Sequence, residues 1–259
     1  GDDLLIGGSA QSFIPSLGNT GSPSTDIGND TLFGGPGNDT LLGGGFEDIN
    51  DNGRFDAEEH ASSRAGNNVG FGGDGDDLIL GGFGADVFGG GTGNDTIEAG
   101  GGADILYGGR GDTNVSGLND VLDAGDGDDI VFASGGNDSV IGGGGIDTLF
   151  GGAGDDTIEG GAGADEIYGG TGDDLLSGGS GADTFAFRAG GGDDVITDFD
   201  IVEDTLILRN TSTDFGDGES VAASAIDTVN GVLIDLGGGD SVLLAGLTVT
   251  DLASLNYVF

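Results

Sequence analysis

Single apolar residues recur every nine positions along most of this chain, and a glycine-rich stretch separates one from the next. These residues are Leu41, Ile79, Phe88, Ile97, Leu106, Leu122, Val131, Val140, Leu149, Ile158, Ile167, Leu176 and Phe185. Side chains alternate between the two faces of a strand, so an apolar residue between two others predicts a three-residue strand with one inward side chain. The six residues that remain predict a tight turn in which glycine permits a positive φ. Two such units then make one turn of a coil, with two thin parallel sheets facing each other across a core of the apolar residues.

An aspartate precedes each apolar residue by two positions, so acidic side chains follow the same period. The expected positions are Asp30, Asp39, Asp77, Asp86, Asp95, Asp104, Asp120, Asp129, Asp138, Asp147, Asp156, Asp165, Asp174, Asp183 and Asp194. In such a coil the aspartates stack in rows along both edges, beside the backbone carbonyl groups of the glycine turns. Carboxylate and carbonyl oxygens suit Ca²⁺, whereas Mg²⁺ prefers to keep its waters. We therefore expect calcium ligands here; the alternative is that the aspartates only cap turns in a metal-free solenoid, where rows of uncompensated carboxylates would repel one another.

The repeat unit also resembles a known calcium-binding sequence. Residues 151–159 read GGAGDDTIE, and the general form is GGxGxDxUx, where U is apolar. This form resembles the nonapeptide of the RTX (repeats-in-toxin) family over most of the chain. The resemblance implies an all-β fold, a right-handed parallel β-roll solenoid over residues 28–197. It further implies that each ion lies between consecutive turns on one edge, held by the repeat aspartates and by loop carbonyls.

The charge of the chain also points to multivalent cations as partners. The sequence holds 47 acidic residues against five basic ones, with a net charge of −42. Such a chain repels itself when compact, and nucleic acid and anionic membranes are poor partners for it. One apolar residue per unit is little burial against the entropy of ordering a chain with 62 glycines. We therefore expect the chain to be unfolded without calcium and to fold when calcium binds.

Three segments interrupt the period. Residues 1–27 contain a partial repeat and a loop over 7–27, to which we assign no role. Residues 108–119 are either a degenerate repeat, with Thr113 in place of the aspartate, or an insertion. This choice decides which sheet every later unit joins. Residues 46–66 read as an EF-hand-like insertion.

The insertion contains a second type of calcium motif. Residues 48–59 fit the pattern D-x-[DN]-x-[DN]-G-x₅-E and resemble an EF-hand or dockerin-type loop. The expected ligands are the side chains of Asp48, Asn50, Asn52, Asp56 and Glu59 and the carbonyl oxygen of Arg54. Three glycines precede the loop in place of an incoming helix, which argues against a sensor that opens to bind targets. The alternative is a merely solvated acidic loop.

Residues 198–259 leave the repeat and read as a C-terminal β cap. Their apolar residues alternate as in strands, and Asn230-Gly231 is a turn signal. A solenoid needs such a cap over its last coil. The order of ADTFAF (182–187), DVITDF (194–199) and an aromatic-aliphatic terminus resembles the end of proteins exported by type I secretion. That resemblance implies an uncleaved C-terminal signal, the type I secretion machinery as partner and an extracellular or cell-surface location; the alternative is a plain β cap.

Aromatic residues predict one further surface. Phe132, Phe150 and Tyr168 are spaced by eighteen and should point outward from one sheet. We hypothesise an aromatic ladder that serves self-association or docks another domain or a ligand. The alternative is stacking between turns that only stabilises the coil.

No catalytic constellation is present in the sequence. The single histidine, His60, lies beside the calcium loop, and there is no HExxH motif, no GxSxG motif and no lysine. We expect a secreted calcium-binding module and not an enzyme, without a membrane span. Gly1 falls within a repeat and methionine is absent, so we expect a fragment of a longer chain. The alternatives are a structural cell-surface protein, such as an adhesin or surface-layer component, or the non-catalytic C-terminal part of a secreted enzyme.

Overall fold

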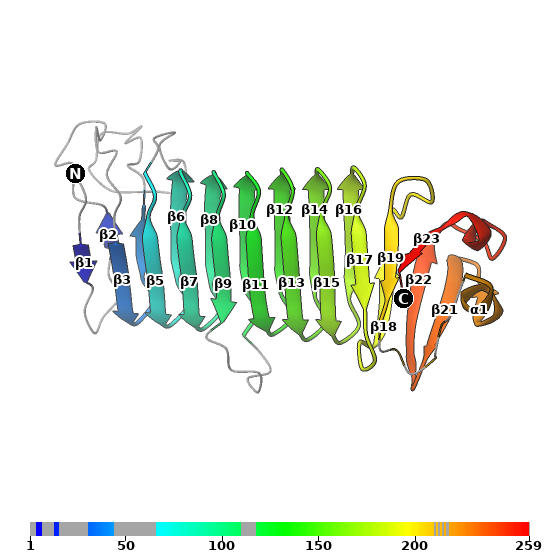
Figure 1. Ribbon diagram of the computed structural model, residues 1–259. Coiled ribbons are helices and arrows are strands. Elements are labelled where there is room, and N and C mark those ends of the chain that lie inside the picture. The colour runs from blue at the N-terminus through cyan, green and yellow to red at the C-terminus, as the bar shows by residue number, and fades with distance from the viewer. Residues whose placement is uncertain are drawn as a thin grey trace.

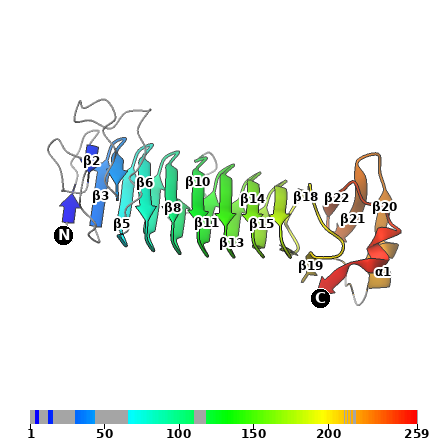
Figure 2. The same ribbon diagram turned by 90° about the horizontal axis from the view of Figure 1, so that it is seen from above.

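The chain winds as a coil whose strands alternate between two facing sheets (Figure 1). The computed structural model describes residues 4–6, 13–15, 31–43, 66–109, 118–209, 211, 213, 215 and 218–258. Seen from above, the described coils follow one another along an elongated body, and the C-terminal segment covers one end (Figure 2). The prediction of a parallel β-roll is confirmed.

Each sheet takes every second strand of the coil. Sheet A, in the order of hydrogen bonding, contains β1 (Leu4–Ile6), β3 (Thr31–Pro36), β5 (Val69–Asp74), β7 (Val87–Thr92), β9 (Ile105–Gly109), β11 (Ile130–Gly135), β13 (Thr148–Ala153), β15 (Glu166–Thr171), β17 (Thr184–Phe187), β19 (Thr205–Leu208) and β23 (Asn256–Val258). Sheet B contains β2 (Phe13–Pro15), β4 (Thr40–Leu42), β6 (Leu78–Phe83), β8 (Thr96–Gly101), β10 (Val121–Asp126), β12 (Ser139–Gly144), β14 (Thr157–Ala162), β16 (Leu175–Ser180), β18 (Asp193–Ile196), β22 (Asp240–Ala245), β21 (Gly231–Gly237) and β20 (Ala225–Asp227). Neighbouring strands are parallel except in the last hairpins, β20–β21 and β21–β22.

The strands are longer than the period predicts. Most repeat strands span six residues, because the ladder continues through the glycines that follow the apolar residue. In β10, for example, Gly125 pairs with Gly143 of β12. The prediction of three-residue strands is therefore wrong: glycine without a side chain lets the backbones of successive coils keep pairing into the turn.

The core lies between the two sheets and holds the predicted apolar residues. Leu149 of sheet A and Ile158 of sheet B, for example, are fully buried in one continuous cluster. Gly70 takes the apolar position in β5, and the ring of Phe88 in the next coil fills the space beside it. A Cβ on Gly70 would lie 2.9 Å from Cδ1 of Phe88. The core is thus filled between coils as well as within them.

The irregular segment changes the length of one coil but not the alternation of the sheets. Coils of the regular run advance by eighteen residues, whereas the step from Asp95 to Asp120 is 25 residues. Because β10 pairs with β8, the units after this segment alternate as those before it do. This coil is therefore seven residues longer than the regular ones. The unchanged alternation is what the insertion alternative expects, and Thr113 itself lies outside the described residues.

The C-terminal segment continues both sheets and closes the end of the coil. β19 and β23 extend sheet A, and β22 extends sheet B beside β18. The helices α1 (Gly218–Ala223) and η1 (Asp251–Ser254) pack with this end, and Val221 and Leu252 join the common core. Among the described residues, no helix has the length and apolar character needed to cross a membrane.

Candidate metal sites

Buried aspartates line the two edges of the coil, at the turns by which the chain enters each sheet. The row at the turns into sheet B contains Asp39, Asp77, Asp95, Asp120, Asp138, Asp156, Asp174 and Asp194. The row at the turns into sheet A contains Asn68, Asp86, Asp104, Asp129, Asp147, Asp165, Asp183 and Asp204. Their side chains are 0–3% exposed. The structure therefore brings the predicted aspartates together as stacked rows, one side chain per coil in each row.

One carboxylate oxygen of each row aspartate from Asp77 onward accepts a hydrogen bond from the preceding coil. The backbone N–H of Asp138 donates to Oδ1 of Asp156 at 2.8 Å, and that of Asp156 donates to Oδ1 of Asp174 at 2.9 Å. The same bond repeats through both rows at 2.6–3.0 Å. A buried backbone donor needs such a partner, so the aspartates tie coil to coil as well as line the edge.

The second carboxylate oxygen has no hydrogen-bond partner along most of both rows. The unpartnered Oδ2 atoms belong to Asp77, Asp86, Asp95, Asp104, Asp120, Asp129, Asp138, Asp147, Asp156, Asp165 and Asp174. A buried carboxylate oxygen without a hydrogen-bond partner is costly, and its recurrence at one repeat position fits a positively charged ligand there.

At six of these aspartates, the unpartnered oxygen and a backbone carbonyl oxygen lie beside the same glycine; they are Asp77, Asp86, Asp120, Asp147, Asp156 and Asp165. A Cβ built on Gly151 would lie 2.4 Å from Oδ2 of Asp156 and 2.5 Å from the carbonyl oxygen of Gly169. On Gly160 the corresponding distances are 2.6 Å to Oδ2 of Asp165 and 2.7 Å to the carbonyl oxygen of Gly178. At these two turns, glycine leaves a space in which a carboxylate and a carbonyl oxygen converge, whereas alanine takes the same repeat position at Ala99, Ala124 and Ala133. This donor set and its repetition fit a hard divalent cation that takes oxygen ligands.

Burial changes the acidity of these side chains. The pKa of Asp156 is raised to about 8, chiefly by burial and also by the neighbouring carboxylates of Asp138, Asp174 and Asp155, against the N–H bond from Asp138 that lowers it. Burial likewise raises the pKa to about 7 at Asp86, Asp95, Asp147 and Asp194. It raises the pKa to about 6 at Asp77, Asp104, Asp120, Asp129, Asp138, Asp174 and Asp204. The ionised rows are therefore strained near neutral pH unless a cation compensates them.

Backbone oxygens must supply much of any coordination shell. Within the described ranges, no three Asp, Glu or His side chains surround one point as a metal cluster would. Each space instead combines a carboxylate with carbonyl groups of the glycine turns, as at Asp156 and Gly169. A cation held there would bridge consecutive coils, and the repeat must be wound before these oxygens meet.

Sequence reasoning missed two features of the edges. Asp204 lies beyond the regular repeat but continues the row at the turns into sheet A. The backbone N–H of Asp183 donates to Oδ1 of Asp204 at 2.9 Å. A second ladder of hydrogen bonds, exposed to solvent, lies beside the row at the turns into sheet B. The backbone N–H of Asp155 donates to Oδ1 of Asn137 at 3.1 Å, and the backbone N–H of Asp173 donates to Oδ1 of Asp155 at 2.9 Å. The signal was present in the sequence as an Asn or Asp directly before each repeat aspartate at this edge.

Some predicted ligands lie outside the described residues. They are Asp30 and the whole EF-hand-like set, Asp48, Asn50, Asn52, Arg54, Asp56 and Glu59. These positions remain predictions from the sequence.

Comparisons with known proteins agree with the repeat. A family model described as the RTX calcium-binding nonapeptide repeat (4 copies) matches residues 24–49, 63–97, 90–115, 116–149 and 150–185. Among solved structures, the extracellular lipase LipA from Serratia marcescens is similar, with 19% identity over 82% of this chain and a TM-score of 0.39. The match spans 42% of the lipase chain. No curated protein matches the sequence.

Proposed function

Because this chain belongs to the family of RTX calcium-binding nonapeptide-repeat proteins, we propose that it is a secreted module whose folding is coupled to calcium. Repeats of this family bind several calcium ions. The proposal therefore concerns what calcium does for this chain and where the chain acts. The observation that carries it is the buried Oδ2 of the repeat aspartates, which has no hydrogen-bond partner and at six of them lies close to a backbone carbonyl oxygen.

The proposed ligands are the repeat aspartates, through Oδ2, and the carbonyl groups of the first glycine in the turns. At the turns into sheet B, Asp156 and the carbonyl group of Gly169 illustrate the arrangement. At the turns into sheet A, Asp165 and the carbonyl group of Gly178 repeat it. A bound Ca²⁺ supplies positive charge between coils, and Oδ1 keeps its N–H bond to the preceding coil. We also propose the loop of residues 48–59 as a separate calcium site.

Coupling to folding follows from the electrostatics of the rows. Without a cation, carboxylates stack one per coil along each edge, and burial and neighbouring charges both oppose their ionisation. The unfolded chain avoids this cost because its carboxylates are separated and solvated. A ligand that binds only the folded state stabilises it by mass action. The chain is thus unfolded where calcium is scarce and folded where calcium is plentiful, as it is outside cells.

We propose an extracellular or cell-surface location and export by a type I machinery. Residues 198–259 serve as cap and secretion signal in this proposal. Their strands β19, β22 and β23 extend both sheets, which supports the role as cap. An unfolded acidic chain suits passage through a narrow channel, and folding on the far side opposes its return.

The chain itself carries no proposed catalytic step. The aspartates that could form an acid–base pair are accounted for by the repeat, where Oδ1 bonds the backbone of the preceding coil. A structural role at the cell surface is the second candidate, and it is favoured by the row of aromatic side chains on the outer face of sheet A, Phe132, Phe150 and Tyr168 among them. This row is proposed as a surface for self-association or docking.

The coupling is tested by circular dichroism during a calcium titration of the chain. We expect little β-structure in excess chelator, a cooperative gain of β-structure with calcium and no comparable gain with the same concentration of magnesium. Full β-structure and cooperative melting in excess chelator would contradict the proposal. Export is tested separately, by expressing the chain with and without residues 198–259 in a host that has a type I machinery, with secretion expected only for the former.

A further inference from the structure

The outer face of sheet A carries a column of aromatic rings, to which six of the coils contribute one ring each. Tyr107, Phe132, Phe150 and Tyr168 occupy paired positions on β9, β11, β13 and β15. Their ring centroids are 5.3, 4.9 and 4.7 Å apart, and the planes of successive rings differ by 10°, 2° and 14°. Phe33 and Phe71 continue the column on β3 and β5, with centroids 5.8 Å apart. The stacking is the arrangement that stabilises neighbouring coils.

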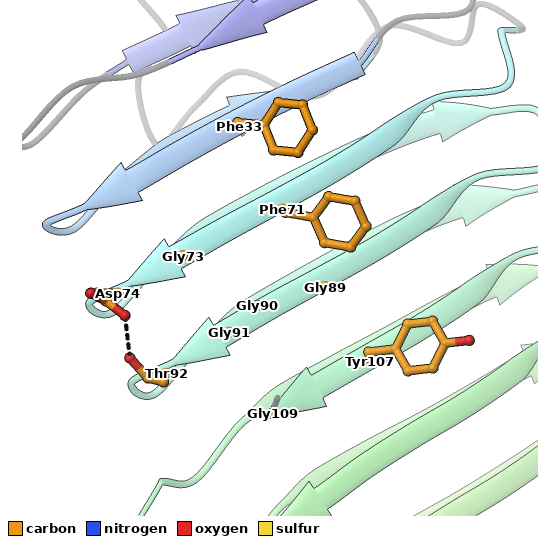
Figure 3. A pocket seen from close by; sticks show the side chains of 10 residues that line it. All are labelled: Phe33, Phe71, Gly73, Asp74, Gly89, Gly90, Gly91, Thr92, Tyr107 and Gly109. Atoms are coloured by element: carbon orange, nitrogen blue, oxygen red, sulfur yellow. Dashed lines mark hydrogen bonds between the residues drawn. The ribbon is translucent and has the colours of Figure 1, made fainter. Parts of the chain in front are cut away.

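The column has one missing ring, at Gly89. This residue pairs with Phe71 on one side and with Tyr107 on the other, so a ring is absent from β7 alone between β5 and β9. A cavity of about 670 Å³ opens there. Its aromatic sides are Phe71 and Tyr107, and its floor is the glycine backbone of β7 (Figure 3).

One end of this cavity is polar. Asp74 and Thr92 are the last residues of β5 and β7, and the Thr92 hydroxyl donates to Oδ1 of Asp74 at 3.1 Å (Figure 3). Both side chains are exposed. The cavity therefore combines two ring faces with one carboxylate at its edge, which is the composition of a small-molecule site with a few orienting polar groups.

We propose that the slot over Gly89 binds a planar aromatic ring that carries a cationic group. The chain itself shows what fits between rings two coils apart, because Phe132 occupies the equivalent space between Tyr107 and Phe150. The carboxylate of Asp74 and the net charge of −42 favour a cation and disfavour an anion. A cation near Tyr and Phe rings gains a further attraction from their faces. This inference goes beyond calcium binding and requires only the folded coil.

Binding is coupled to a small shift of Phe71. A Cβ on Gly89 would lie 2.9 Å from Cδ1 of Phe71, so this ring leans over the missing position. Its centroid distance to Phe33, 5.8 Å, exceeds the 4.7–5.3 Å found between the other stacked rings. Phe71 therefore has room to move back towards Phe33 when a ring enters.

The slot can be closed by completing the column. Gly89→Phe adds the missing ring, and the atom that it meets first is the ring edge of Phe71, which can shift. Ala186→Phe is the matched control. Ala186 follows Phe185 in β17 and therefore holds the column position one coil after Tyr168, outside the slot. The first variant removes the site and the second adds a ring without touching it.

The test uses tryptamine and the calcium-loaded chain. The protein has no tryptophan, so indole fluorescence reports the ligand alone. We expect saturable binding of one tryptamine, loss of that binding in Gly89→Phe and unchanged binding in Ala186→Phe. Asp74→Asn should weaken binding about threefold, the effect of one exposed charge pair. Indole-3-propionate, which carries a negative group, should bind more weakly than tryptamine.

Two outcomes overturn the proposal. One is the absence of saturable tryptamine binding to the calcium-loaded chain. The other is equal affinity in Gly89→Phe and Ala186→Phe when circular dichroism shows that both are folded. Should Gly89→Phe fail to fold, Tyr107→Ala replaces it: this change removes one aromatic side of the slot, and retained affinity in the folded variant overturns the proposal equally. Calcium-dependent folding is measured in the same samples, so failure of the slot is distinguishable from failure of the calcium mechanism.

Discussion

Replacing Gly151 with alanine places a methyl group where two oxygen ligands are proposed to meet a calcium ion. The added Cβ would lie 2.4 Å from Oδ2 of Asp156 and 2.5 Å from the carbonyl oxygen of Gly169, both closer than real Cβ contacts come. Gly151 does not have a positive φ, so its backbone accepts alanine without strain. The substitution therefore acts on the space between the oxygens and not on the conformation of the turn.

The expected magnitude follows from the loss of one ion. Extracellular calcium modules bind with a Kd of about 10⁻⁴–10⁻³ M, so 10 mM calcium is about 10–100 times Kd. One site then contributes about 1.4–2.7 kcal/mol to the free energy of unfolding. Gly151→Ala should lose at most this much at 10 mM calcium, because alanine stands naturally at the same repeat position at Ala99, Ala124 and Ala133. It should also raise the calcium concentration at the folding midpoint.

The matched control is Gly144→Ala. Gly144 takes the repeat position at which Ala153 and Ala162 stand naturally, and it pairs directly with Ala162. The nearest atom to its added Cβ is Oδ1 of the Asp126 side chain, at 3.2 Å. We expect little change in this variant. The assay is urea unfolding at fixed calcium, followed by far-ultraviolet circular dichroism. If Gly151→Ala and Gly144→Ala have the same calcium midpoint and the same stability, the ligand assignment is refuted.

Three further predictions test the rows and the aromatic column. Asp156→Asn should raise the calcium concentration at the folding midpoint. Asp155→Asn should not raise it, because asparagine stands naturally at the equivalent position, Asn137. Equal midpoints of the two variants in a calcium titration would count against Asp156 as a ligand. Burial raises the pKa of Asp156 from 3.8 to about 8, so the calcium-free fold binds more protons than the unfolded chain. Its stability should be greatest below about pH 4 and fall as pH rises towards 8, as read by circular dichroism. Replacing Phe132 and Phe150 by serine should cost about 0.5–1.5 kcal/mol for each lost stacked pair, beyond the apolar area lost. Analytical ultracentrifugation of the same variant separates the two roles, since unchanged assembly with lower stability favours stacking alone and lost assembly favours the docking surface.

The sequence alone was sufficient to predict the structure of the nine-residue repeat unit. The alternation around Ile158 and the glycines before Asp156 each depend on neighbours within nine residues, and their steric preferences are local. The same period placed aspartates two residues before each buried apolar side chain, which was enough to predict two acidic edges. Carboxylates beside glycine carbonyls, repeated in this way, also identified calcium as the fitting cation.

The tertiary structure decided what happens between coils. The two oxygens of Asp156 differ only because the next coil presents the carbonyl oxygen of Gly169 to one of them, while the preceding coil gives the N–H of Asp138 to the other. Asp204 joins a row of buried aspartates from outside the period, because β19 stacks on β17. No local pattern reports either relation.

The glycines show most clearly which features the sequence predicts and which only the tertiary structure decides. The composition predicts that glycines form turns, but it cannot tell that Gly70 accommodates the ring of Phe88, or that Gly89 leaves a slot between Phe71 and Tyr107. Those roles depend on which residue lies one coil away, and that distance varies along the chain, with steps of 18, 25 and 38 residues between successive aspartates of one row. Local sterics fix the shape of one unit, whereas the number of residues wound into each coil determines which units touch.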